Sequence, residues 1–212
     1  MKILHHTFLF GFILGLGALL CMAQASTANA ASRTWDGGGS DAKWSTCANW
    51  SSNACPTASD SVTFNTTSTK SATLDSSAVG TVTGLTISTG YTGTITQSRS
   101  LTINGNYAQA AGTFLGDTAN IDINGTYTLS GGSFTSTSGT LFVSAGWANS
   151  AGTFVHNNGS VELDGGTSTM NLPGKTAVNF YNFRINKNNG VILTVSSGDT
   201  VVVNGALNLS EG

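Results

Sequence analysis

The sequence predicts an all-β protein, a parallel β-helix, and three observations point to this fold class. Three segments of 20 residues, 101–120, 121–140 and 141–160, align on one another without a gap. Within each segment apolar and polar residues alternate at the start, which is the period of a β-strand and not of a helix. Charged residues make up 8% of the chain and hydrophobic residues 39%, which favours ordered β-structure over a disordered chain.

Equivalent positions of the three segments carry the same kind of residue. Position 1 is Leu or Ile, position 3 is Ile or Val, position 7 is Tyr or Trp, and position 14 is always Phe. Small residues at position 5 and at positions 11 and 12 mark corners between short strands. In stacked coils about 4.8 Å apart, equivalent side chains lie above one another. We therefore expect Phe114, Phe134 and Phe154 to form a ladder inside the coil.

The repeat frame extends beyond these segments and defines the expected domain organisation. The frame restarts at Val161 and again at Val201, and residues 84–97 look like a degenerate coil. We expect coils over residues 81–212 and an N-terminal cap over 31–80, with the C-terminal end lacking a cap, as in the front part of a longer protein. An antiparallel array of hairpins or an outer-membrane barrel is the alternative, although membrane strands need about 9–11 residues.

Residues 1–30 have the layout of a secretory signal peptide. Lys2 precedes the apolar run 8–22, and small residues follow with A-x-A sites that end at Ala25 and Ala30. Cleavage then leaves Ser26 or Ala31 as the first residue of an exported protein. An uncleaved membrane anchor and a lipid attached to Cys21 are the alternatives.

The charge balance excludes some classes of partner. The chain has 8 Lys and Arg against 10 Asp and Glu, and the leader contains only Lys2 among them. No basic cluster occurs, so we expect no nucleic-acid binding and, after cleavage, no membrane binding. Two cysteines remain outside the leader, Cys47 and Cys55, and an oxidising compartment predicts a disulfide between them.

Residues 33–64 carry three of the four tryptophans, Trp35, Trp44 and Trp50, in the patterns W-x-G-G and W-x-x-x-x-N-W, followed by P-x-x-x-D-x-V-x-F. This segment resembles the start of bacterial β-strand-repeat surface proteins of the autotransporter-passenger and filamentous-adhesin kind. The matching residues are Trp35, Gly37, Gly38, Trp44, Asn49, Trp50, Pro56, Asp60, Val62 and Phe64. The resemblance implies a right-handed β-helix that is exported and displayed on the cell surface.

The same tryptophans have two interpretations. Exposed indole rings can stack on sugars, so Trp35, Trp44 and Trp50 are candidate glycan-binding residues. The other interpretation is that they are buried as a cap over the first coil, because an apolar coil end has to be covered.

Catalytic groups are few. Glu162 and Asp164 lie two residues apart on one strand, and Asp122 occupies the position of Glu162 two coils earlier, about 9–10 Å away, with Phe142 between them. That separation lies at the edge of the range for inverting glycosidases. Possible metal ligands are not clustered in the sequence, because Asp117, Asp122, Asp164 and Asp199 are dispersed along the chain. We expect neither a metal nor another cofactor.

The sequence therefore predicts an exported, non-enzymatic protein of the bacterial cell surface with a structural or adhesive function. Its expected partners are surface glycans or other surface proteins, or further copies that join end to end through open coil ends. A carbohydrate-active β-helix, which degrades or binds polysaccharide, is the alternative function.

Overall fold

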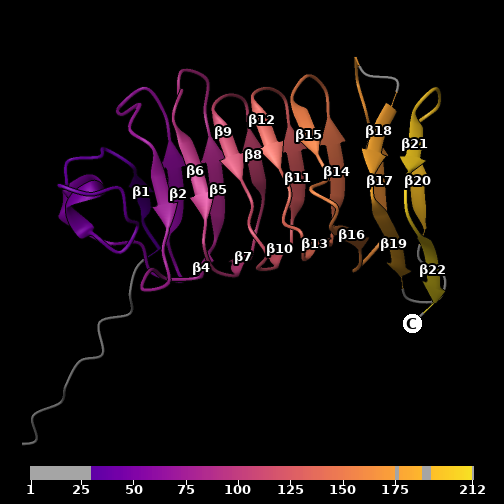
Figure 1. Ribbon diagram of the computed structural model, residues 1–212, viewed down its shortest axis with the longest axis horizontal. Helices are drawn as coiled ribbons and strands as arrows, with labels where there is room; N and C mark the ends of the chain where they lie inside the picture. Colours follow the sequence, from indigo (N-terminus) through magenta and orange to yellow (C-terminus); the bar gives the residue numbers. More distant parts are fainter. Residues whose placement is uncertain (1–29, 175–176, 188–191, 212) are drawn as a thin grey trace, which may run out of the picture.

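The computed structural model describes residues 30–174, 177–187 and 192–211 and shows a three-sided parallel β-solenoid. Seven coils stack into a rod whose first coil lies beside the N-terminal segment and whose last coil ends the described chain (Figure 1). Every pairing between the named strands is parallel, and neighbouring strands in a sheet come from successive coils. The predicted parallel β-helix is thus confirmed, whereas its right-handed winding stays a prediction.

The first side of each coil belongs to an eight-stranded sheet. Its strands, in spatial order, are β1 (Ser32–Thr34), β2 (Ser61–Phe64), β5 (Gly84–Ile87), β8 (Tyr107–Gln109), β11 (Thr126–Leu129), β14 (Gly146–Asn149), β17 (Ser168–Asn171) and β20 (Leu193–Val195). Strand β1 precedes the first complete coil and extends this sheet at the N-terminal end of the rod.

The second side is divided into two sheets. Five strands form the first part, β3 (Ala72–Leu74), β6 (Thr94–Gln97), β9 (Thr113–Leu115), β12 (Ser133–Thr135) and β15 (Thr153–Val155). Two strands, β18 (Ala177–Phe180) and β21 (Thr200–Val203), form a separate sheet. The ladder therefore breaks between β15 and β18, where the coil becomes longer.

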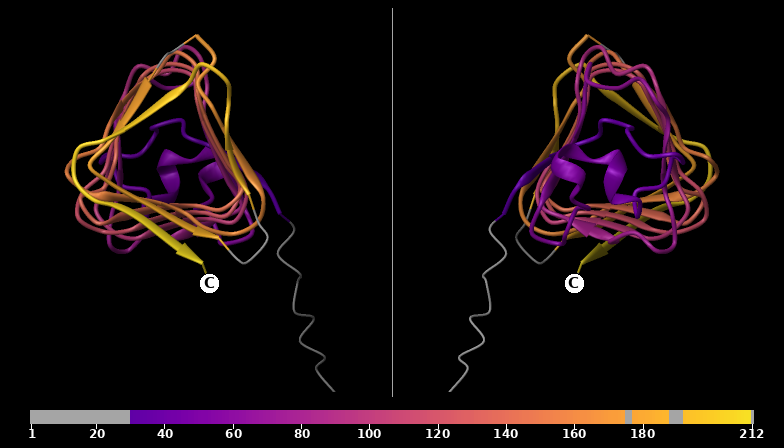
Figure 2. Two further views of the ribbon diagram at one scale, coloured as in Figure 1. Left: turned by 90° about the vertical axis from the view of Figure 1, so that its right-hand side faces the viewer. Right: turned by 90° about the vertical axis from the view of Figure 1, so that its left-hand side faces the viewer.

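The third side is a seven-stranded sheet. Its strands are β4 (Thr81–Val82), β7 (Leu101–Ile103), β10 (Ile121–Ile123), β13 (Thr140–Val143), β16 (Ser160–Leu163), β19 (Asn182–Lys187) and β22 (Leu207–Glu211). Viewed along the rod, the three sides enclose a triangle, and the short helices η1 (Cys47–Asn49) and η2 (Ser51–Asn53) lie across its N-terminal end (Figure 2).

The 20-residue register holds in the middle of the rod and changes toward its ends. Leu101, Ile121, Leu141 and Val161 are paired in successive strands of the third side, as the repeat predicts. Beyond them the coils lengthen, because the corners contain more residues. The first side pairs Ser61 with Gly84 and Ser168 with Leu193, and these pairs are 23 and 25 residues apart in the chain.

The prediction that the repeat frame restarts at Val201 is wrong. Val201 pairs with Val178 on the second side, and Leu207 pairs with Phe183 on the third side, which is the side of position 1. The longer corners of coils six and seven cause this shift. At the other end, β2 and β3 are already paired strands of the solenoid, so the coils begin at Ser61, inside the segment 31–80 expected to be a cap.

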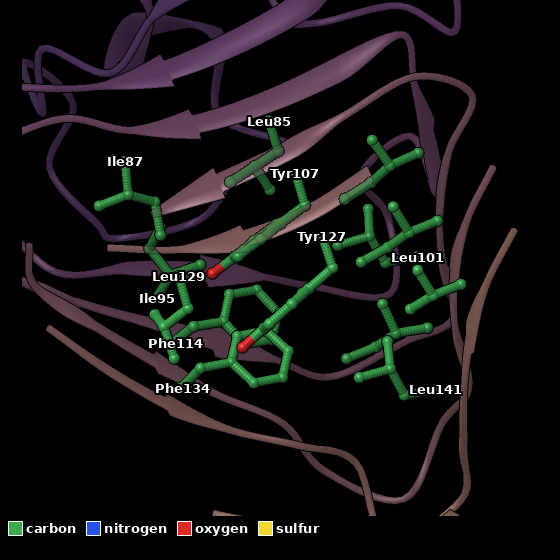
Figure 3. Packing of buried hydrophobic residues seen from close by; sticks show 14 of the residues in the cluster. Leu85, Ile87, Ile95, Leu101, Tyr107, Phe114, Tyr127, Leu129, Phe134 and Leu141 are labelled. Atoms are coloured by element: carbon green, nitrogen blue, oxygen red, sulfur yellow. The ribbon is translucent and has the colours of Figure 1, made fainter. Parts of the chain in front are cut away.

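The core fills the triangle with aromatic and branched aliphatic side chains. Tyr107 and Tyr127 are stacked on the first side, with ring centroids 5.4 Å apart. Their edges meet the rings of Phe114 and Phe134 from the second side, and Leu101 and its equivalents approach from the third side (Figure 3). Parallel stacking places like residues together, so each ring is in contact with rings above and beside it.

One glycine corner shows why small residues recur at fixed positions. Gly132 has φ +69°, and a Cβ atom at this position would lie 2.4 Å from the carbonyl oxygen of Gly112 in the coil before. Gly112 has the same left-handed conformation, with φ +61°. Only glycine adopts this conformation at low cost while the backbones of two coils approach so closely. The repeated glycines thus set the sharpness of the corner.

Candidate functional site

The outward face of the third side carries both acidic and basic residues of the repeats. Its central row contains one outward residue from each successive strand, and neighbouring strands are paired in register. In order, these residues are Thr102, Asp122, Phe142, Glu162, Arg184 and Asn208. This row brings together two of the carboxylates predicted from the sequence, Asp122 and Glu162, and adds basic and amide groups from β19 and β22.

Glu162 is the most buried carboxylate of this face. It is 7% exposed, and its two oxygens have different partners. The side-chain amide of Asn186 donates to Oε1 at 2.7 Å, and Nη1 of Arg184 donates to Oε2 at 3.4 Å. Arg184 keeps 44% of its side chain exposed, so the guanidinium lies at the rim of the face. Glu162 is thus held by two partners from the next coil.

Asp122 and Asp164 lie apart from this ion pair. Asp122 faces Phe142 in the next coil, and Phe142 faces Glu162, so the aromatic ring lies between the two carboxylates as predicted. Partial burial and the negative charge of Asp164 raise the pKa of Asp122. Asp164 accepts a hydrogen bond from Oγ of Ser144 at 2.7 Å. The three carboxylates therefore occupy three different environments.

The ammonium group of Lys187 binds backbone and not a carboxylate. Its Nζ donates to the carbonyl oxygen of Asp164 and, at 3.0 Å, to that of Gly166. Burial lowers the pKa of Lys187, and the negative charge of Asp164 opposes this shift. Lys187 is 5% exposed, so its main effect is to hold the corner that follows β16.

This geometry gives little support for glycoside hydrolysis. Asp122 and Glu162 are two coils apart, about 9–10 Å. A general base has to accept a proton from water, and an acid has to donate one to the leaving group. Both oxygens of Glu162 already accept hydrogen bonds, and Phe142 fills the place between the carboxylates where an attacking water would lie.

An open depression lies beside this ion pair. Its volume is about 310 Å³, at the lower end of the range for small-ligand sites. Hydroxyl, amide, carboxylate and guanidinium groups line it, and all of them can form hydrogen bonds with sugar hydroxyls. The lining residues are Thr140, Ser160, Glu162, Asn182, Phe183, Arg184, Ala206 and Asn208. This depression is of ligand size and lies on the outward face of the third side.

The three tryptophans lie together at the N-terminal end of the core. Trp35, Trp44 and Trp50 are 0–1% exposed, and their rings surround Phe64 of the first coil at centroid distances of 5.6–5.8 Å. Nε1 of Trp35 donates to the carbonyl oxygen of Lys70 at 2.9 Å. Rings buried to this extent have no face on which a sugar could stack, so this arrangement matches a cap over the first coil.

The loop around these tryptophans is tied to the first coil by polar groups. Nζ of Lys70 donates to the carbonyl oxygens of Gly37 and Gly39, at 3.0 and 2.6 Å. Asn49 is fully buried, and its Oδ1 accepts from the backbone N–H of Gly39 at 3.0 Å. Asp75 of the first coil accepts from Oγ and N of Ser45 at 2.7 and 3.0 Å. The glycines and Asn49 of the sequence motif therefore have structural functions.

The disulfide predicted between Cys47 and Cys55 is confirmed. It closes the loop 47–55, which contains η1, the buried Trp50 and η2. The cap is thereby held by a covalent bond as well as by its packing.

The three phenylalanines of the predicted ladder are adjacent in the structure. Phe134 is paired with Phe114 on one side and with Phe154 on the other. The centroids of Phe114 and Phe134 are 4.9 Å apart, and those of Phe134 and Phe154 are 6.0 Å apart, with nearly parallel rings in both pairs. Phe114 and Phe134 are buried, whereas Phe154 is only partly buried beside the break between β15 and β18.

Sequence reasoning missed Arg184, Asn186 and Lys187. No repeat frame in the sequence connects the segment that contains these residues to Glu162. The signal was the alternation of Phe183 and Ile185 with polar residues, which places Arg184 on the outward face of the same strand. Pairing Arg184 with Glu162 would have required knowing that this coil contains 22 residues between equivalent positions and not 20.

Within the ranges 30–174, 177–187 and 192–211, no helix has the length and apolar character that a membrane span requires. In the same part of the chain, no three His, Cys, Asp or Glu side chains come together as metal ligands. The predicted leader lies outside the described residues except for Ala30.

No family model, no curated protein and no solved structure matches this chain. The fold alone therefore defines the class of this protein. It is a parallel β-solenoid whose N-terminal end is tied by a disulfide.

Proposed function

We propose that this chain is an exported, non-enzymatic protein of the bacterial cell surface, whose β-solenoid serves as a rigid, low-charge stalk. The observation that supports this most strongly is the uninterrupted aromatic and aliphatic core, which runs from the buried tryptophans to Phe183. Such a core makes the rod a single stiff body. The resemblance of residues 33–64 to bacterial surface proteins points to the same function.

The disulfide supports export. Disulfides persist in oxidising compartments and are rare in the cytosol. Cys47 and Cys55 are bonded in the structure, and a leader-like segment precedes them in the sequence. The two features come from different parts of the chain and indicate the same compartment.

Surface glycans are the proposed partners, and the depression beside Glu162 and Arg184 is the proposed contact. Its lining combines hydroxyl and amide groups with one exposed guanidinium, which suits the hydroxyl groups of a polysaccharide. Glu162 positions Arg184 through their ion pair, and in this proposal Glu162 supports binding and takes no part in catalysis. A polysaccharide-degrading enzyme on this scaffold is the alternative.

Export is tested by expressing the whole chain in a bacterium and separating cytoplasm, envelope and medium. We expect the protein outside the cytoplasm, with Cys47 and Cys55 resistant to thiol alkylation until a reductant is added. A protein that stays in the cytoplasm with both thiols reactive would contradict the proposal.

Binding and catalysis are tested on the purified, exported protein. Pull-down on insoluble cell-wall polysaccharides is compared for the unchanged protein, Arg184→Gln and a control, Asn124→Ala, at an exposed corner outside the depression. We expect Arg184→Gln to weaken retention at least threefold and the control to leave it unchanged. Release of reducing sugars that stops in Glu162→Gln would instead establish the enzymatic alternative.

A further inference from the structure

The described chain enters the fold through a hydrogen bond to a buried carboxylate. The backbone nitrogen of Ala31 donates to Oδ1 of Asp60 at 2.8 Å, and Asp60 is 1% exposed. The carbonyl oxygen of Ala31 accepts from the backbone N–H of Ser61 at 2.9 Å. Ala30 is exposed, so the peptide bond between Ala30 and Ala31 lies at the protein surface.

The other oxygen of Asp60 is already occupied. Oδ2 accepts from the backbone N–H and the hydroxyl of Thr57, at 2.9 and 3.0 Å, and from Nε of Arg33 at 3.3 Å. Burial alone would raise the pKa of Asp60, but the hydrogen bonds from Thr57, Ala31 and Arg33 outweigh it, and the pKa is lowered. In the described chain, Oδ1 accepts only from Ala31. The nitrogen of Ala31 thus faces an ionised group with room for a stronger donor.

The sequence places a cleavage site at the same bond. The second A-x-A site of the leader ends at Ala30. Hydrolysis of the next peptide bond consumes one water molecule and leaves a carboxylate on Ala30 and an amino group on Ala31. That amino group takes up a proton near neutral pH, because α-amino groups have pKa values of about 7.7–8.0. One neutral N–H donor is thereby replaced by a cation that has three donors.

We propose that the leader is cut between Ala30 and Ala31 and that the new α-ammonium group of Ala31 forms an ion pair with Asp60, which completes the first coil. Before cleavage only the acceptor of this hydrogen bond carries a charge, whereas after cleavage both partners do and the Coulomb attraction of an ion pair is added. Cleavage at the other site, after Ala25, leaves residues 26–30 attached and keeps a neutral amide opposite Asp60. The position of the buried carboxylate thus distinguishes two sites that the sequence alone leaves equivalent.

This inference rests on the proposed export, and sequencing the N-terminus of the exported protein separates the two. A mature protein that starts at Ala31 supports the inference. A start at Ser26 overturns the inference and leaves export standing. A protein that remains in the cytoplasm with its leader overturns both.

The ion pair itself is tested by stability measurements on the chain that starts at Ala31. Acetylating the α-amino group keeps one N–H donor and removes the charge. At pH 6.5 we expect acetylation to lower Tm by about 2–4 °C. The same comparison in the Asp60→Asn variant is expected to give less than half of that change. Equal Tm values for the free and acetylated forms of the unchanged protein would overturn the ion pair.

The pH dependence has a definite sign. An ion pair raises the pKa of the folded ammonium group above its unfolded value, so its contribution is complete below about pH 7.7 and is lost as pH rises through the folded pKa. The other side chains that donate to Asp60 are Arg33 and Thr57.

A second measurement applies if Asp60→Asn does not fold. The pKa of the α-amino group is obtained from the pH dependence of its acylation rate in the unchanged protein. We expect a pKa above that of a short peptide with the same first residues. As a control, the chain that starts at Ser26 should have an α-amino pKa equal to the peptide value. A value for Ala31 at or below the peptide value would overturn the proposal.

Discussion

Replacing Phe134 by alanine removes the central ring of the aromatic ladder. Phe134 is fully buried, and its ring is stacked between those of Phe114 and Phe154. It also meets the edges of Tyr107 and Tyr127 at centroid distances of 5.3 and 5.1 Å. The substitution therefore leaves a cavity between three coils and removes four aromatic contacts.

The magnitude follows from burial and from these contacts. Truncating a fully buried phenylalanine costs about 3–5 kcal/mol. We expect Phe134→Ala to lie in the upper half of that range, because aromatic pairs add about 0.5–1.5 kcal/mol beyond area burial. Phe154→Ala at the partly buried end of the ladder should cost less, about 1–2 kcal/mol, because less apolar area returns to water.

Urea unfolding, followed by circular dichroism and by tryptophan fluorescence, measures both changes in free energy of unfolding. The matched control is Thr135→Ala, an outward position on the same strand, for which we expect a change within about 0.5 kcal/mol. The order Phe134, then Phe154, then Thr135 follows from the burial of each side chain. If Phe134→Ala cost no more than Phe154→Ala, the stacked core would be refuted.

The remaining predictions concern corners and the cap. Gly132→Ala should destabilise the protein by at least about 1–2 kcal/mol in urea unfolding, because Gly132 has a positive φ. The control Gly166→Ala should be neutral, because an added Cβ there meets nothing within 4 Å. Equal effects of the two substitutions would contradict the corner geometry. Burial would raise the pKa of Asp75, but hydrogen bonds, chiefly from Ser45, outweigh it, so that the pKa is lowered. The stabilisation by Asp75 is therefore present above about pH 4 and is lost as pH falls through the folded pKa. An acid titration of tryptophan fluorescence should show the cap loosening over that range in the unchanged protein, and an identical curve for Asp75→Asn would refute this. Reducing the disulfide should cost up to about 2.6 kcal/mol, the value for so short a loop, and no loss of stability in dithiothreitol would contradict the covalent tie.

The middle of the rod could be predicted because its letters repeat at a constant spacing. Leu101, Ile121 and Leu141 are equivalent in sequence and paired in space. These inward-facing positions of the stacked coils hold apolar residues of similar shape, so the pattern and the packing have the same cause. The identical register also places Phe114 and Phe134 in contact.

The last two coils could not be predicted because their corners vary in length. An extended corner on the protein surface costs little, and each extra residue displaces the frame that follows. Val201 and Leu207 fit positions 1 and 7 of the repeat, yet they lie on the second and third sides. An apolar residue that alternates with polar ones looks the same on every side of the coil.

The candidate site could likewise be predicted only where the 20-residue spacing holds. Asp122 and Glu162 were predicted on one outward row because the 20-residue spacing holds between them. The two groups that donate to Glu162 are Arg184 and Asn186, and they come from the first coil after Glu162 in which the spacing changes. The sequence thus indicated two carboxylates on one face but not the ion pair that occupies one of them.

The stacking of successive coils is tested most directly by distances between spin labels on the first side. Thr63, Thr128, Ala148 and Asn171 occupy one register row, with Thr128 three coils beyond Thr63 and each later residue one coil further. Cysteines introduced at Thr63 and at one of the other positions are labelled in the chain that starts at Ala31, where the native cysteines are bonded to each other. A parallel solenoid predicts that the mean label distance rises by about 4.8 Å per coil across the three pairs. Distances that do not rise in equal steps from Thr128 to Asn171 would contradict it.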